Sequence, residues 1–334
     1  MAVTESFNIQ RPGQRNGAGA IDALHIEQYT GVVEETLERT SVLAPMIPFR
    51  TVRGTSIITN YAVGSSTLQK VVPGVVLDGT KNDFSKVSLH VETTIAARNI
   101  IPQIEVFQTE YDARAEIGRE HGKLLGKFKD QALFIQAIKA GLATDSAYRG
   151  ADAAGKPLGH FGGSQQTLGA AGDVTDPAKI YAAIAGLLTK LELKDVHPQT
   201  ENVMIGVKPD VFYTLMQAEQ LVNVNYITAS GNSVQAWVLK AYGVPVISSN
   251  NFPGGEVISG HYLDTVNNGN SFSGDYSKVV AVALSPRALL AGYTLPLETD
   301  VFYDKLSKSW FVDAAEAYSA TPNRNEFAGV ILKP

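Results

Sequence analysis

Residues 50–91 constrain the fold of this chain most, because their pattern indicates two long strands without a core of their own. Thr55 to Val63 and Phe84 to Arg98 are rich in alternating β-branched residues, which is typical of strands. Glycine, proline and serine are frequent between these runs, and large apolar residues are few. Since a lone hairpin is marginally stable in water, the pattern predicts an extended, loosely structured hairpin that lies on another surface.

The longest predicted helix runs from Tyr111 to Ala143, about 45 Å at ~1.5 Å per residue. Gly118, Gly122 and Gly126 lower its helix propensity and therefore indicate close packing. Its expected buried stripe consists of Ile117, Leu124, Leu125, Phe128, Ala132, Leu133 and Ile135. Its expected solvent face consists of Arg114, Glu116, Arg119, Glu120, Lys123, Lys127, Lys129 and Asp130.

Further elements complete an α+β pattern without an internal repeat. A helix is predicted from Ile26 to Val42, and a glycine-rich surface loop, with room for a short hairpin, from Thr144 to Thr175. Asp176-Pro177 caps another helix, whose buried face contains Ile180, Ile184, Leu187, Leu188 and Leu191. Strand–helix alternation follows, with strands at Val203–Val207, Val244–Ile247, Val279–Leu284 and within Val301–Ala317, and a helix from Pro209.

Composition excludes several classes of protein. The 334 residues contain no cysteine, so disulfides, thiolate metal sites and a cysteine nucleophile are absent. A net charge of −5 with interleaved signs is not the basic footprint of tight nucleic-acid binding. The N-terminus lacks the pattern of a signal peptide, and no apolar run approaches ~20 residues. We therefore expect a chain made in the cytoplasm.

No pattern predicts a catalytic, cofactor-binding or metal-binding residue. Gly150 to Pro157 matches a phosphate-binding loop except at its last position, where Pro157 supplies no hydroxyl for magnesium. Gly17-Ala18-Gly19 lacks the third glycine of a dinucleotide fingerprint. Without paired catalytic groups the chain is predicted not to be an enzyme.

Two further patterns also fail as metal sites. Asp264 to Asp275 resembles a calcium loop, but Val266 occupies a ligand position and Asp275 is shorter than the expected glutamate. Asn267 to Asn270 is better explained as a turn. The six histidines are scattered without metal-ligand spacing: His25, His90, His121, His160, His197 and His261.

The order of the parts resembles the Hong-Kong-97-type capsid fold. Short motifs are similar to those of the short-tailed, T-seven-like double-stranded-DNA phages: Tyr29-x-Gly31-x-Val33, Leu37-x-Arg39-Thr40-Ser41-Val42, Pro73-Gly74-x-x-Leu77-Asp78, Tyr111-Asp112-Ala113-Arg114-x-Glu116, Val207-x-Pro209-Asp210-x-x-Tyr213 and Ala328 to Lys333. The resemblance implies an N-terminal arm (1–25), a helix and lead-in (26–49), an extended loop (50–91), a peripheral domain with a spine helix (92–143), a glycine-rich loop (144–175), an axial domain (176–284) and return strands (285–334).

The resemblance also implies a function. Major capsid proteins of this kind self-assemble as hexamers and pentamers into an icosahedral shell around phage DNA, with a scaffolding protein, a portal and in some cases a decoration protein as partners. They are made in the bacterial cytoplasm and end in the virion. Some members of the wider fold cross-link a loop lysine to an asparagine of the next subunit. Lys70 and Lys81 lie in the corresponding loop, but no matching asparagine is identifiable.

Two alternative functions remain open from sequence alone. The first is an encapsulin-like compartment, against which the polar arm and the T-seven-like motifs argue. The second is a soluble α+β enzyme with a degenerate phosphate loop at 150–157.

Overall fold

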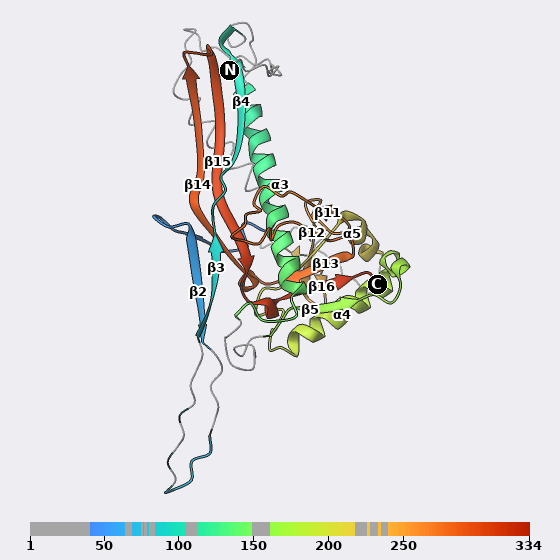
Figure 1. The fold of residues 1–334 in the computed structure, drawn as a ribbon. Helices are drawn as coiled ribbons and strands as arrows, with labels where there is room; N and C mark the ends of the chain where they lie inside the picture. The colour runs from blue at the N-terminus through green and yellow to red at the C-terminus, as the bar shows by residue number, and fades with distance from the viewer. Residues whose placement is uncertain are drawn as a thin grey trace.

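The computed structural model describes residues 41–63, 69–74, 76, 79, 84–104, 113–148, 161–217, 226–227, 233–234 and 240–334. These residues form a compact region, a long arm of strands and helix, and a thin hairpin that leaves the body in the opposite direction from the arm (Figure 1). The longest helix, α3, connects the arm to the compact region. Among the described helices, none is long and apolar enough to cross a membrane.

The arm is a four-stranded sheet with α3 along one face. Its strand order is β1 (Phe49–Thr51), β14 (Leu289–Asp304), β15 (Ser309–Pro322) and β4 (Ile95–Pro102). β1 is parallel to β14, and the other neighbours are antiparallel. On the inner face, Ile117 and Leu125 of α3 (Ala113–Leu142) pack against Ile101, Val301 and Val312 of the sheet. This apolar cluster holds the helix on the arm.

The compact region is built on a six-stranded mixed sheet. Its strand order is β5 (Ser164–Thr167), β16 (Ala328–Leu332), β13 (Val279–Leu284), β6 (Met204–Val207), β10 (Val244–Ser248) and β9 (Lys240–Ala241). All six residues of β13 are buried, as expected for a central strand covered on both faces. The C-terminal half of α3 packs here, where a Cβ on Gly206 would lie 2.6 Å from the ring of Phe134. Glycine at 206 therefore lets helix and sheet approach closely.

Shorter elements complete the described chain. The helices α4 (Pro177–Glu192) and α5 (Pro209–Met216) join the same core as the six-stranded sheet. The remaining pairs and turns are β2 (Ile57–Val63) with β3 (Phe84–His90), β7 (Tyr226–Ile227) with β8 (Ser233–Val234), β11 (Val257–Ile258) with β12 (Gly274–Asp275), and the 3-10 turns Ala171–Thr175, Pro286–Ala288 and Asn325–Phe327.

Several predicted elements are confirmed. The long helix spans Ala113–Leu142, and the three glycines expected at close packing, Gly118, Gly122 and Gly126, are all buried. Asp176 caps α4 by accepting a hydrogen bond from the backbone N–H of Ala178 at 3.0 Å, with Pro177 at the first helical position. The predicted buried face of α4 is buried throughout. Residues 26–40 of the predicted helix at 26–42 lie outside the described residues.

Other predictions about local structure are wrong. Phe84 to Arg98 is not one strand: β3 ends at His90, and β4 begins at Ile95 in a different sheet. In Thr144–Thr175, predicted as a surface loop with room for a short hairpin, the described residues contain a 3-10 turn and β5, which pairs with the distant strand β16 and not with a neighbouring one. Leu124 is 51% exposed and does not belong to the buried stripe of α3.

Candidate assembly interface

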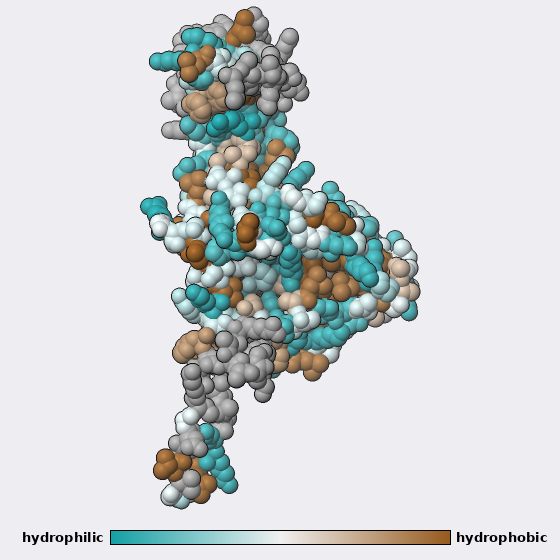
Figure 2. Space-filling model, in the orientation of Figure 1, coloured by the Kyte–Doolittle hydropathy of each residue, from teal (hydrophilic) through white to brown (hydrophobic). Residues whose placement is uncertain are grey.

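The hairpin β2–β3 has few buried side chains, and they lie in its two strands near the body. In its antiparallel register, Ile58 lies opposite Leu89, and both pack with Leu290 of β14 and Ala317 of β15. Farther along, Tyr61 and Phe84 are 71% and 73% exposed. Figure 2 shows apolar residues gathered again at the far end, where Val71, Val72 and Val76 are exposed. Apolar side chains on a thin ribbon cannot bury one another, so their burial requires another molecule.

A polar triad fixes the base of the hairpin to the body. Asn60 points to the same face as Ile58, and its side-chain N–H donates to Tyr148 Oη at 2.7 Å and Asn323 Oδ1 at 3.0 Å. The hydroxyl of Tyr148 in turn donates to Asn323 Oδ1. The triad joins β2, the segment after α3 and the end of β15. It therefore holds the hairpin in one direction relative to the body.

A buried ion pair joins the middle of α3 to the arm. Lys129 Nζ lies 2.6 Å from Glu316 Oε2 of β15 and 3.0 Å from the hydroxyl of Tyr293. The side chains of Lys129 and Glu316 are 2% and 0% exposed. Burial by itself lowers the pKa of Lys129, but Glu316 and Tyr293 outweigh this, so the pKa lies above its ordinary value. Lys129 is therefore a cation at neutral pH.

Aromatic rings surround this cation. The Nζ atom of Lys129 lies 5.1 Å from the ring centre of Tyr293, 5.2 Å from that of Tyr318 and 6.0 Å from that of Phe49. These distances lie within the range of cation–π attraction. Because the rings come from β1, β14 and β15, the single lysine connects α3 to three strands of the arm.

The next residue of α3, Asp130, binds the segment Ser41–Leu43, where the described residues begin. Its carboxylate accepts hydrogen bonds from Ser41 Oγ at 2.5 Å and from the backbone N–H groups of Val42 and Leu43 at 2.8 and 3.1 Å. Asp130 is fully buried. The prediction that Lys129 and Asp130 lie on the solvent face of the helix is therefore wrong, because each has a charged or polar partner in the interior.

Removing the carboxylate of Asp130 is expected to release Ser41–Leu43 from α3. Asp130→Ala leaves a buried hydroxyl and two N–H groups without their acceptor, which should lower the free energy of unfolding by about 2–4 kcal/mol. Urea unfolding measures this loss, and hydrogen exchange should show lost protection at Val42 and Leu43. Glu116→Ala, an exposed carboxylate on the same helix, is the control and should change stability by less than about 0.5 kcal/mol. Equal effects of the two substitutions would contradict this role.

The segment 261–273 is a turn closed by its own hydrogen bonds. Asp264 accepts hydrogen bonds from the backbone N–H groups of Phe272 and Ser273 at 2.8 and 3.2 Å. His261 is stacked between Phe128 and Phe272, and burial lowers its pKa, so it is neutral at neutral pH. Within the described ranges, no group of three or more histidine or carboxylate side chains could hold a metal ion. The predicted turn at Asn267–Asn270 is confirmed.

Comparison with known proteins assigns the family. A family model described as phage capsid protein matches residues 103–331, well over half of the chain. The chain belongs to the phage capsid protein family. The matched region contains α3, the long strands β14 and β15 of the arm, nearly all of the six-stranded sheet and the buried pair Lys129–Glu316.

Two curated relatives of this phage capsid protein come from Enterobacteria phage T3. A major capsid protein and a minor capsid protein are each 28% identical to it over 182 residues, which is 53% of this chain. The alignments cover 51% of the major and 41% of the minor protein. The chain therefore matches about half or less of the length of these relatives.

Similar solved structures are also capsids. The capsid of cyanophage P-SCSP1u has a TM-score of 0.71 at 14% identity. The superposition covers 88% of this chain and 88% of the other. The mature capsid of bacteriophage PhiM1 has a TM-score of 0.68 at 21% identity, covering 88% of this chain and 87% of the other. A virus-like particle from Pyrococcus furiosus has a TM-score of 0.53 at 11% identity, covering 92% and 99%. The predicted Hong-Kong-97-type α+β fold class is confirmed.

Among the described residues, the sequence patterns weighed for chemistry do not converge on one site. The phosphate-loop pattern at 150–157, the glycines of 17–19, Lys81, His25 and His160 lie outside the described residues. Lys70 is exposed on the hairpin, and His121 contacts Asn99 at 3.0 Å between α3 and β4. His90 lies 4.0 Å from Glu92. His197 lines a cavity described below.

The burial of the polar residues around α3 differs from the prediction made from helical periodicity. Spacing alone contains a signal for Lys129, because Leu125, Lys129 and Leu133 stand four residues apart on the buried face. A lysine at such a position indicates a buried partner rather than a solvent face.

Proposed function

We propose that this chain is the major capsid protein of a short-tailed, T-seven-like double-stranded-DNA phage. It self-assembles as hexamers and pentamers into an icosahedral shell that encloses the DNA without reading its sequence. The observation that carries the proposal is the hairpin β2–β3. It packs on the body at one end and exposes apolar side chains beyond that end. A segment of this kind gains its burial by lying on a neighbouring subunit.

Multivalency explains why such contacts suffice. One hairpin offers a small contact area, but each subunit in a closed shell both gives and receives one. Many weak contacts then act together, so the shell is more stable than any single contact. We infer that the N-terminal arm, residues 1–25, also orders against neighbours. The hydrogen bonds from Val42 and Leu43 to Asp130 support this, because they fix the position of the chain that follows the N-terminal arm.

We further propose the division of labour that the resemblance implies. The extended loop (50–91) and the peripheral domain (92–143) contact other subunits, and the axial domain (176–284) faces the centre of a capsomer. The glycine-rich loop (144–175) and the return strands (285–334) link these parts. A scaffolding protein and a portal assist assembly in the bacterial cytoplasm, and the finished protein resides in the virion.

Two observations favour the phage capsid over the alternatives. Both curated relatives are phage capsid proteins, and the two similar structures with TM-scores of 0.71 and 0.68 are phage capsids, which favours a phage shell over an encapsulin-like compartment. Membership of a capsid family supports a structural role and disfavours an enzyme.

Electron microscopy of the purified full-length chain tests the proposal. Closed shells, tubes or six-fold rings are expected, with light scattering giving a particle far larger than a small oligomer. DNA that copurifies with the particles and resists nuclease until the shell is opened would separate a phage shell from a protein-filled compartment. A uniform small oligomer that binds nucleotide, and loses it on Lys156→Ala, would overturn the proposal in favour of an enzyme.

A further inference from the structure

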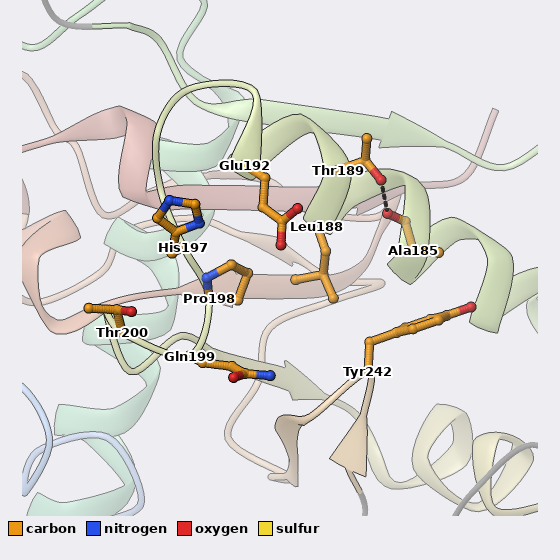
Figure 3. Close-up of a pocket in the computed structure, with 9 residues that line it drawn as sticks. All are labelled: Ala185, Leu188, Thr189, Glu192, His197, Pro198, Gln199, Thr200 and Tyr242. Atoms are coloured by element: carbon orange, nitrogen blue, oxygen red, sulfur yellow. Dashed lines mark hydrogen bonds between the residues drawn. The ribbon is translucent and has the colours of Figure 1, made fainter.

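A cavity of about 500 Å³ opens in the compact region between α4 and the segment 197–200 (Figure 3). Its walls are Ala185, Leu188, Thr189, Glu192, His197, Pro198, Gln199, Thr200 and Tyr242. In the close-up, Leu188, Pro198 and Tyr242 border the open centre, and Glu192 points from α4 toward the same space. The cavity thus combines apolar walls, an aromatic ring and a carboxylate.

The charge of this cavity is unbalanced. Glu192 is the only carboxylate among the nine lining residues, and none of them is lysine or arginine. Two lysines close in sequence donate elsewhere: Lys190 Nζ to Gln165 O at 2.6 Å, and Lys194 Nζ to Gly162 O at 2.8 Å. In the part of the chain that the structure describes, no cation pairs with Glu192. The cavity therefore presents a carboxylate with which a positive group can pair.

The aromatic wall is placed there at a conformational cost. Tyr242 has a φ of +52° and Gly243 a φ of +81°, in the two-residue turn between β9 and β10. Such a turn favours asparagine, aspartate or glycine at its first position and disfavours a bulky residue. The ring of Tyr242 is nevertheless held, 48% exposed, by stacking on Tyr181 at 4.5 Å. Strain of this kind concentrates at functional positions.

We propose that this cavity is an anchor site for an arginine side chain in a basic peptide segment of a partner protein. The planar guanidinium stacks on Tyr242 and pairs with Glu192, and the aliphatic part of the side chain lies on Leu188 and Pro198. Gln199 and Thr200 add polar side-chain groups at the edge of the cavity. The site is separate from the hairpin and goes beyond shell building.

Saturation-transfer NMR on the full-length chain tests the site, with acetyl-Gly-Arg-Gly-amide as the probe. The arginine δ-methylene protons should receive the strongest signal. The matched peptide with citrulline, which is neutral but similar in shape, should bind about five-fold more weakly, as should the arginine peptide to Glu192→Gln. Asp195→Asn removes a nearby exposed carboxylate that does not line the cavity, and its affinity should stay within about two-fold of wild type.

A second variant separates the ring from the backbone that carries it. Tyr242→Asn places a residue favoured at positive φ in the turn, so the thermal midpoint should not fall, while peptide binding should be lost. The proposal is overturned if the wild-type chain transfers no signal to the arginine peptide at millimolar concentration. It is equally overturned if citrulline binds as tightly as arginine, or if both Glu192→Gln and Tyr242→Asn bind like wild type. Shell formation by these variants is a separate readout, so failure here leaves the capsid proposal intact.

Discussion

Lys129→Ala is expected to destabilise the protein by about 3–5 kcal/mol, because it leaves the carboxylate of Glu316 buried without a counter-charge. Glu316 is fully buried, and its Oε2 receives the 2.6 Å hydrogen bond from Lys129. Its other oxygen, Oε1, has no hydrogen-bond partner among the described residues. Lys129 therefore provides the main compensation for this charge. Urea unfolding monitored by circular dichroism measures the loss.

The double variant Lys129→Met/Glu316→Leu isolates the cause. It removes both charges and fills the same space with apolar side chains, so it should recover most of the stability lost by the single variant. A single-variant loss below about 1 kcal/mol would show that the pair is not isolated from water. A double variant as unstable as the single one would show that packing, and not the stranded charge, causes the loss.

Alkaline pH gives an independent check on the same pair. The pKa of Lys129 is raised in the folded protein by Glu316 and Tyr293, which outweigh burial. The stabilisation from its charge is therefore fully present below the pKa of lysine in the unfolded chain, about 10.4. It is lost as the pH rises through the higher pKa of the folded state. The wild-type chain should lose this increment of stability above about pH 10, and the apolar double variant should not.

This pair also has a geometric consequence for a shell subunit. α3 packs by its N-terminal half on the arm and by its C-terminal half on the six-stranded sheet, and Lys129 lies between the two clusters. The angle between arm and compact region is therefore set at a buried, directional contact. We infer that this directional contact helps to give every subunit of the proposed shell nearly the same shape.

Local sequence predicted the elements well where one pattern decides them. The cap at Asp176-Pro177, the helix Ala113–Leu142 and the fully apolar strand Val279–Leu284 are all where periodicity and capping place them. The buried pair was missed because periodicity treats a charged residue as a surface residue. Glu316, the charged partner that allows Lys129 to be buried, lies 187 positions away in the chain.

Non-local pairing also explains the errors in strand assignment. β5 pairs in parallel with β16, so Ser164 lies beside Gly329, and nothing in the Gly- and Ser-rich sequence near Ser164 specifies that partner. The run from Phe84 to Arg98 keeps a strand-like pattern through a change of sheet, because His90 pairs with Ile57 and Arg98 pairs with Asp313. Which sheet a strand joins is decided by tertiary contacts.

Shortening the hairpin is expected to leave a folded subunit that does not form closed shells. Val63 and Phe84 lie directly opposite each other, so a two-residue Asn-Gly turn can replace residues 64–83. The buried base, with Ile58, Leu89 and Val91, is retained. The thermal midpoint should therefore change by only about 2 °C, while the yield of closed particles should fall by more than about ten-fold.

A length-matched control separates reach from contact. Replacing residues 64–83 with a Gly-Ser linker of equal length keeps the span of the loop but removes its apolar side chains, including the exposed Val71, Val72 and Val76. If burial of these side chains on a neighbour holds the shell together, the linker variant should fail as completely as the shortened one. Particles from the linker variant alone would mean that the loop acts by its length. Normal shells from both variants, counted by electron microscopy and sized by light scattering, would show that assembly does not use the hairpin and would overturn its place in the proposed function.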